Sequence, residues 1–199
     1  MVTKNISLAL LFALAATPAA LADSWKIDPK HSAASFSVRH MMVSTVRGQF
    51  SNVTGTVNFD PKNVAASKVD AVIDVTTVNT NEADRDKHLK SPDFFDVEKF
   101  PTMKFVSKGV VVESVGKFKL VGDLTLHGVT KEVTLAVEGP SQAIKDQKGN
   151  ERSGATATGK INRNDFGIKF NKAMDNGGVM VGDQIPITID IELIKSTKG

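Results

Sequence analysis

The sequence of 199 residues contains no cysteine and no tyrosine, and its charges nearly cancel, with 25 Lys and Arg against 22 Asp and Glu. The lack of cysteine excludes disulfides and thiolate metal sites, so stability has to come from packing and backbone hydrogen bonding. The interspersed charges exclude the basic surface that is typical of nucleic-acid-binding proteins. Beyond residue 22 there is no run of about 18 uncharged apolar residues, so no transmembrane helix is expected.

The first 22 residues have the pattern of a cleavable export signal. Lys4 precedes an apolar run from Ile6 to Ala16, and Ala20, Leu21 and Ala22 form a small-residue cleavage site. We therefore expect an exported, soluble mature chain that begins at Asp23. Its 177 residues (199 minus 22) suit a single domain, 23–199.

A period of two in hydrophobicity dominates the mature chain. It is clearest where Ile187, Ile189 and Ile191 alternate with Thr188 and Asp190, a pattern that is typical of a half-buried strand. Short turns rich in Asn, Asp, Gly and Pro separate such segments, and no long helical crossover is present, so the strands are expected to be antiparallel. The expected strands are 24–27, 32–40, 45–59, 68–78, 102–112, 116–126, 129–138, 153–163 and 185–195.

These strands predict an all-β protein, either a sandwich or a barrel. We favour an extended antiparallel barrel, because the 45–59 run is long enough to bend at Gly48 or Gly55 and because closure removes exposed sheet edges. A barrel of about eight strands can hold one small ligand. The small residues Ala155 and Ala157 on one face of the 153–163 strand either leave room inside or merely allow close packing.

A short helix is expected at about 82–90, between segments that otherwise read as strands. Asn81 is expected to cap it, Glu82 and Asp84 favour its positive end, and Asp86 is expected to pair with Lys90.

One face of this helix combines Arg85, His88 and Leu89, and Phe94 and Phe95 follow it closely. Such a segment could act as a lid that seats an apolar tail and keeps a polar head at the mouth. The alternative is a helix that caps the barrel, with the Phe residues in the core and with Arg85 and His88 engaged in structural pairs.

Six ordered segments carry a resemblance that covers essentially the whole mature chain. They are WKIDPKHSAASFSVRH (25–40), VRGQF (46–50), DRDKHLKSPDFFD (84–96), FPTMKF (100–105), GDLTLHGVTKEV (122–133) and NRNDFGI (162–168). Together they resemble the YceI-like family, the lipocalin-like, polyisoprenoid-binding proteins of bacterial periplasms. The resemblance implies a periplasmic barrel whose hydrophobic pore takes a long isoprenoid chain, such as a quinone or prenyl-phosphate tail.

On this interpretation apolar strand residues line the pore, and Arg85 and His88 lie at its mouth. Burial contributes about 3 to 4 kcal/mol gross for each five-carbon unit, so two or three units offset the cost of association. The alternation does not show which side of the barrel each strand residue faces. The expected ligand-binding residues are Phe36, Val38, Phe50, Val57, Arg85, His88, Leu89, Phe94, Phe95, Phe105, Leu120, Leu124 and Phe166.

Two other classes of protein stay open. A metal-dependent hydrolase would have to use His31, His40, His88 and His127, but these are scattered singly, without the spacing of a known metal motif. We therefore expect no enzyme, no metal and no cofactor apart from the bound lipid. The other class is a ligand-free structural or interaction protein, and a homodimer that shields two mouths or edges is also compatible with the sequence.

The start of the mature chain carries one more polar group. Asp28, His31 and Ser32 are expected to form a turn that locks the first strands, because the Ser hydroxyl lacks the G-x-S-x-G context of a nucleophile.

Overall fold

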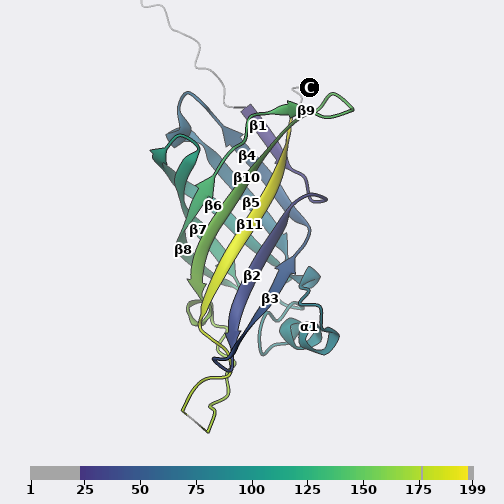
Figure 1. Cartoon of the computed structure of the whole chain (residues 1–199), viewed down its shortest axis with the longest axis vertical. Coiled ribbons are helices and arrows are strands. Elements are labelled where there is room, and N and C mark those ends of the chain that lie inside the picture. Colours follow the sequence, from purple (N-terminus) through teal and green to yellow (C-terminus); the bar gives the residue numbers. More distant parts are fainter. Residues whose placement is uncertain (1–22, 176, 197–199) are drawn as a thin grey trace, which may run out of the picture.

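Figure 1 shows the computed structural model, which describes residues 23–175 and 177–196. Eight strands in this part of the chain close into an antiparallel barrel, because β11 pairs with β10 on one side and with β1 on the other. The expected all-β antiparallel barrel is thus confirmed. The barrel strands are β1 (Asp23–Ile27), β4 (Val53–Phe59), β5 (Lys68–Asp74), β6 (Thr102–Ser114), β7 (Lys117–Leu126), β8 (Val129–Glu138), β10 (Glu151–Asn162) and β11 (Gln184–Lys195).

A hairpin of two further strands lengthens the barrel wall. β2 (Ala33–His40) pairs with β3 (Ser44–Phe50), and β11 changes its partner along its length to join them. The segment Leu193–Lys195 pairs with β1, whereas Ile187–Asp190 pairs with β2. The hairpin lies at the lower end of the barrel, beside α1 (Ala83–Lys90), and the short strand β9 (Ile144–Lys145) lies at the upper end (Figure 1).

Three short 3₁₀ helices join strands among the described residues. They span Val64–Ala66, Val75–Thr77 and Arg163–Phe166. No helix in this part of the chain is long and apolar enough to cross a membrane. The expected export signal, residues 1–22, lies outside the described residues.

The expected strand 45–59 is divided in two, which corrects the sequence interpretation. Ser51 and Asn52 separate β3 from β4, and Asn52 has a φ of 59°. Asn adopts this left-handed conformation more readily than most residues, so the corner falls there and not at Gly48 or Gly55. Gly48 instead allows close packing, because an added Cβ would lie 2.5 Å from Cζ of Phe36.

The expected helix is confirmed at Ala83–Lys90, but its cap is different. The Glu82 carboxylate accepts hydrogen bonds from the backbone N–H groups of Asp84 and Arg85, at 3.1 and 2.6 Å. Asn81 is not the cap, because it has a φ of 60° and stands one residue too early. An N-cap residue needs an extended backbone, and Glu82 has it at φ −150°.

Asp86 also has a different partner from the one expected. Its Oδ1 accepts hydrogen bonds from the backbone N–H and the hydroxyl of Thr80, at 2.8 and 2.5 Å, and no ion pair joins it to Lys90 within the described chain. The carboxylate therefore ties the helix to the segment before it. Thr80 is 5% exposed, so this contact is shielded from water.

Candidate functional site

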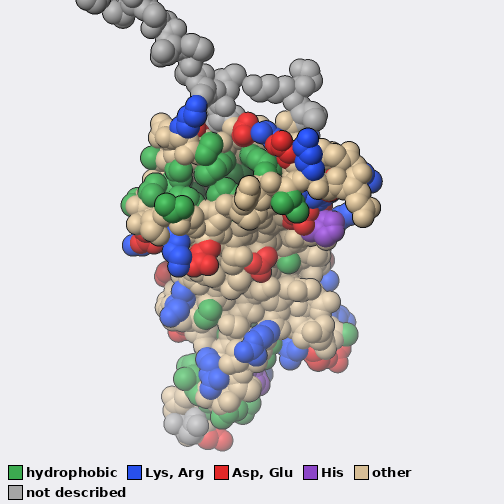
Figure 2. Space-filling view, turned by 45° about the horizontal axis from the view of Figure 1, so that its top comes forward, with side chains coloured by type: hydrophobic (Ala, Val, Ile, Leu, Met, Phe, Trp, Pro, Cys, Tyr) green, Lys and Arg blue, Asp and Glu red, His purple; other side chains and the backbone are tan. Residues whose placement is uncertain are grey.

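The inward side chains of the barrel strands leave a large apolar chamber of about 310 Å³. Val57, Phe105, Leu120 and Leu124, all predicted to bind ligand, are among its lining residues. Apolar residues of the strand ends and connections at the upper end complete the lining, and Figure 2 shows apolar side chains gathered around a hollow at this end. These residues are Phe59, Pro61, Val64, Phe118, Pro140 and Ala143. We call this space the upper chamber.

The small residues of β10 confirm both interpretations that the sequence left open, at different positions. Ala155 and Ala157 line the upper chamber, so they leave room inside. At Gly159 an added Cβ would lie 2.7 Å from Cδ2 of Leu135, so this glycine allows close packing.

The buried polar groups near the upper chamber already have partners. The Ser153 hydroxyl donates to the backbone O of Ser141 at 2.7 Å, and Ser67 Oγ accepts from the backbone N–H of Asp60 at 3.4 Å. Among the described residues no buried side-chain nitrogen or oxygen lacks a hydrogen-bond partner. A ligand inside the barrel therefore finds mostly hydrocarbon, and a polar group on it is favoured in water at the opening.

A second apolar space, the lower chamber, has a volume of about 130 Å³ and lies toward the end that carries α1. Besides Leu124, which lines both chambers, the structure brings together six of the predicted site residues there, from β2, β3, α1 and the segment after α1. Phe50 packs against the rings of both Phe36 and Phe95, with ring centroids 5.4 Å apart in each pair. The six residues are Phe36, Val38, Phe50, Leu89, Phe94 and Phe95.

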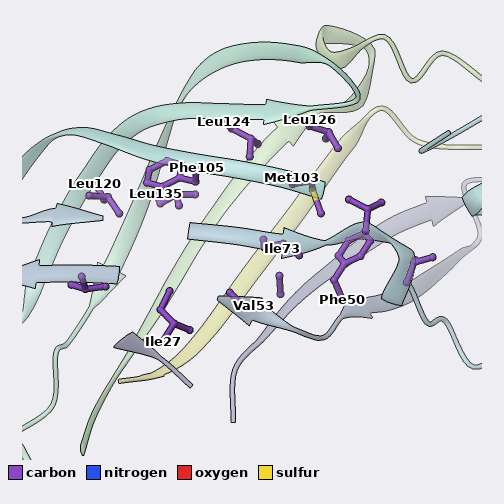
Figure 3. Close-up of a cluster of buried hydrophobic side chains, with 14 of the residues drawn as sticks. Ile27, Phe50, Val53, Ile73, Met103, Phe105, Leu120, Leu124, Leu126 and Leu135 are labelled. Carbon is purple, nitrogen blue, oxygen red and sulfur yellow. The ribbon is translucent and has the colours of Figure 1, made fainter. Parts of the chain in front are cut away.

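A single layer of side chains separates the two chambers. Five residues line both spaces, one each from β5, β6 and β7 and two from β11, and Figure 3 labels three of them. Only Leu124 among them was predicted. Three of the others could have been predicted, because inward strand positions follow a period of two. They are Ile187 and Ile189 in the alternating sequence of β11 and Met103 in the FPTMKF segment at the start of β6. The five residues are Ile73, Met103, Leu124, Ile187 and Ile189.

Three predicted site residues line neither chamber. Phe166 is 2% exposed and belongs to the buried hydrophobic core. Arg85 donates from Nε to the Thr80 hydroxyl at 2.8 Å and from Nη2 to the Thr80 carbonyl at 2.9 Å.

His88 is the third of these residues. Its Nε2 lies 2.9 Å from Oδ2 of Asp93, and its ring packs edge-on against Phe94 and Phe170. Arg85 and His88 thus form the structural pairs that the sequence left as the alternative, on a helix at the end opposite the upper opening (Figures 1 and 2). A role for them in binding stays a prediction, without contact to either chamber.

A cluster of ionisable groups joins the first turn to β10 and β11. His31 Nδ1 and Arg152 Nη1 each lie 2.9 Å from Oδ2 of Asp28, and Arg152 also donates to Glu192. The Ser32 hydroxyl accepts from the backbone N–H of Glu192 at 3.0 Å. These bonds confirm that Asp28, His31 and Ser32 lock the first strands in place.

Among the described residues, this cluster alone brings three potential metal ligands close together. One ligand atom each of Asp28, His31 and Glu192 lie within 4.8 Å of one another. The Arg152 guanidinium, however, binds both carboxylates and supplies the positive charge that a metal ion would bring. The hydrogen bond from His31, with a further one from Arg152, lowers the pKa of Asp28 to about 2 against the opposing effect of burial. The arrangement is that of a structural ion-pair network.

The fold and its apolar chambers define a lipocalin-like barrel. The family model of the YceI-like domain matches residues 25–193, and the chain belongs to the YceI-like family. A UPF0312 protein of Staphylococcus aureus is 37% identical over 169 residues, which cover 85% of this chain and 96% of that protein. A UPF0312 protein of Vibrio vulnificus is 40% identical over 165 residues, covering 82% and 87%.

Solved structures show the same fold. The YCEI protein of Campylobacter jejuni superposes with a TM-score of 0.65 at 31% identity, covering 79% of this chain and 90% of that one. BcnA of Burkholderia cenocepacia has a TM-score of 0.70 at 22% identity, covering 83% and 98%. A domain of Saccharophagus degradans, described as polyisoprenoid binding, has a TM-score of 0.62 at 16% identity, covering 89% and 100%.

Proposed function

We propose that this protein is a periplasmic binding or carrier protein for a long-chain isoprenoid or a similar amphiphilic lipid, of the quinone or prenyl-phosphate type, and not an enzyme. The observation that carries the proposal is the pair of adjoining apolar chambers in which no buried polar side chain is left without a partner. Membership of the YceI-like family and the likeness to the Saccharophagus degradans polyisoprenoid-binding domain support it. The leader pattern of residues 1–22 supports export.

The size of the upper chamber suits a prenyl tail. An apolar cavity of about 150 Å³ holds benzene, with its six carbons, so 310 Å³ corresponds to about twelve carbons, or somewhat more than two isoprene units. Burial of two units contributes about 7 kcal/mol gross, from which the costs of association and ordering are subtracted. A head group gains nothing inside the barrel, so binding depends on the tail.

Mass spectrometry of the protein purified from its own periplasm without detergent tests the proposal. We expect a stoichiometric adduct under native conditions that extracts into organic solvent as a prenyl lipid. The same spectra report whether two barrels form the predicted homodimer. An empty, metal-free protein that also fails to take up added prenyl lipids would contradict the carrier function and favour the ligand-free scaffold, and stoichiometric metal without lipid would favour the hydrolase.

Two neighbouring positions on β10 offer a matched pair of variants. Ala157 lines the upper chamber, whereas Thr158 is exposed on the outer face of the same strand. Ala157→Phe places a ring inside the chamber and is expected to abolish the adduct, because the ring takes the space of about six carbons. Thr158→Phe adds the same ring outside and is expected to retain it. Equal lipid retention in the two folded variants would show that the lipid is not in the upper chamber.

A further inference from the structure

The layer between the chambers contains one side chain that differs from the rest. Ile73, Ile187 and Ile189 are β-branched, which leaves them stiff at χ1, Leu124 is branched at Cγ, and the positions of the three isoleucines in the strands are set by the sheet register. Met103 is unbranched and has three rotatable bonds beyond its Cα, so it changes shape at low cost. Met103 is therefore the part of the layer most able to move.

The surroundings of Met103 give it somewhere to move. Its backbone pairs with that of Ile73 across β5 and β6, and Figure 3 shows its side chain projecting from β6 toward Phe50, a lining residue of the lower chamber. Met103 is 7% exposed, and it lines both chambers. A shift of its thioether into the lower or the upper space would join the two chambers.

The lower chamber is the smaller of the two apolar spaces. Ile168 and Val181 line this chamber, and their backbone carbonyls accept hydrogen bonds from Arg163, at 2.8 and 3.2 Å. The volume of 130 Å³ corresponds to about five carbons on the scale of a benzene-sized cavity, which is one isoprene unit. The upper chamber takes somewhat more than two units on the same scale.

We propose that Met103 determines the length of hydrocarbon tail that this protein accepts. A tail of two isoprene units fills the upper chamber with the layer intact, and a third unit enters the lower chamber only when Met103 moves aside. The inference rests on the proposed binding of prenyl lipids and adds to it a length preference and the residue that sets it.

Binding of geraniol, farnesol and geranylgeraniol to the purified, delipidated mature protein tests this inference, since these alcohols share a head group and increase by one isoprene unit each. We expect farnesol to bind about tenfold more tightly than geraniol, because its third unit enters the lower chamber. Native mass spectrometry of the protein with an equimolar mixture measures this ratio directly.

Two variants block the third unit from opposite sides of the layer. Met103→Phe puts a stiff ring into the layer, and Ala34→Leu fills the lower chamber from β2, since Ala34 lines that chamber alone. Both are expected to reduce the preference for farnesol over geraniol to less than about twofold while geraniol binding changes less than about threefold. Met103→Ala opens the layer and is expected to increase that preference. The exposed Thr102, next along β6, provides the control Thr102→Ala, with wild-type ratios.

The outcomes separate the inference from the function on which it rests. A wild-type protein that binds none of the three alcohols contradicts the proposed function and this inference together. A wild-type protein that binds them without a preference for farnesol, or with a preference that a folded Met103→Phe or Ala34→Leu variant leaves unchanged, contradicts this inference alone. Circular dichroism and the urea midpoint of each variant show that it is folded, and either blocking variant by itself decides the question.

Discussion

Replacement of Arg163 by Met is expected to be among the most destabilising single changes in this barrel. Arg163 is 5% exposed, and its guanidinium donates to the Asp183 carboxylate at 2.7 Å and to four backbone carbonyl oxygens at 2.8 to 3.2 Å. One buried side chain thus holds the loop that follows β10. The four carbonyls belong to Ile168, Phe170, Val181 and Gly182.

The expected loss in the free energy of unfolding follows from the hydrogen bonds that Met cannot make. The aliphatic stem is retained, so little packing is lost, but four carbonyls lose a charged donor. Val181 keeps the Asn171 amide as a donor at 2.9 Å, and each buried group left without a partner costs about 1 to 3 kcal/mol. Water can reach the Asp183 carboxylate, whose side chain is 45% exposed, so that group adds little. Relief of the desolvation of the guanidinium offsets part of the loss. We expect the free energy of unfolding to fall by about 3 to 4 kcal/mol.

Urea denaturation followed by tryptophan fluorescence measures this change, because Trp25 is the single tryptophan and is buried in the barrel. Arg47→Met provides the control, since Arg47 is exposed on β3, and it is expected to change stability by less than about 0.5 kcal/mol. A loss below about 1 kcal/mol for Arg163→Met, with an unchanged urea dependence, would refute the view that this guanidinium holds the lower end together.

Two further predictions concern the hydrogen bonds of Asp28 and the packing of the barrel wall. The pKa of Asp28 is lowered from 3.8 to about 2, chiefly by the hydrogen bond from His31, so its stabilising effect is complete above pH 3.8 and is lost as the pH falls through about 2. Asp28→Asn should therefore lower the free energy of unfolding, measured by urea denaturation at pH 6, by at most about 2 kcal/mol after screening by solvent, and most of the difference from wild type should be lost by pH 2. Gly122→Ala should destabilise the barrel by about 1 to 3 kcal/mol in thermal unfolding, because the added Cβ would lie 2.5 Å from Cζ of Phe105.

The controls for these two predictions use positions of the same kind. Gly109 lies on β6 with no atom within 4 Å of an added Cβ, so Gly109→Ala should leave the melting temperature nearly unchanged. Equal effects of alanine at Gly109 and Gly122 would contradict the packing argument. A stability difference between wild type and Asp28→Asn that persists at its full size near pH 2 would show that the Asp28 carboxylate is not the group that titrates.

Most of the predicted site could be found because inward strand positions follow a period of two. Val57, Phe105, Leu120 and Leu124 line the upper chamber, as such a pattern allows. Phe166 lies in a 3₁₀ helix, where that period does not apply, and it lines neither chamber. Arg85 and His88 were expected at a mouth because charged residues on an apolar helix face suggest a ligand, yet each has a partner within five residues in sequence.

Local patterns in the sequence by themselves determined the all-β class, most strand positions, the helix at Ala83–Lys90 and the family resemblance. These features depend on side-chain alternation and on capping, which act over a few residues. Tertiary structure alone decided which faces of the strands point inward, that five side chains divide the interior into two chambers, and that Arg163 binds carbonyls up to 19 residues away. Such contacts follow from the register and closure of the sheet, which join residues remote in sequence and leave no local pattern.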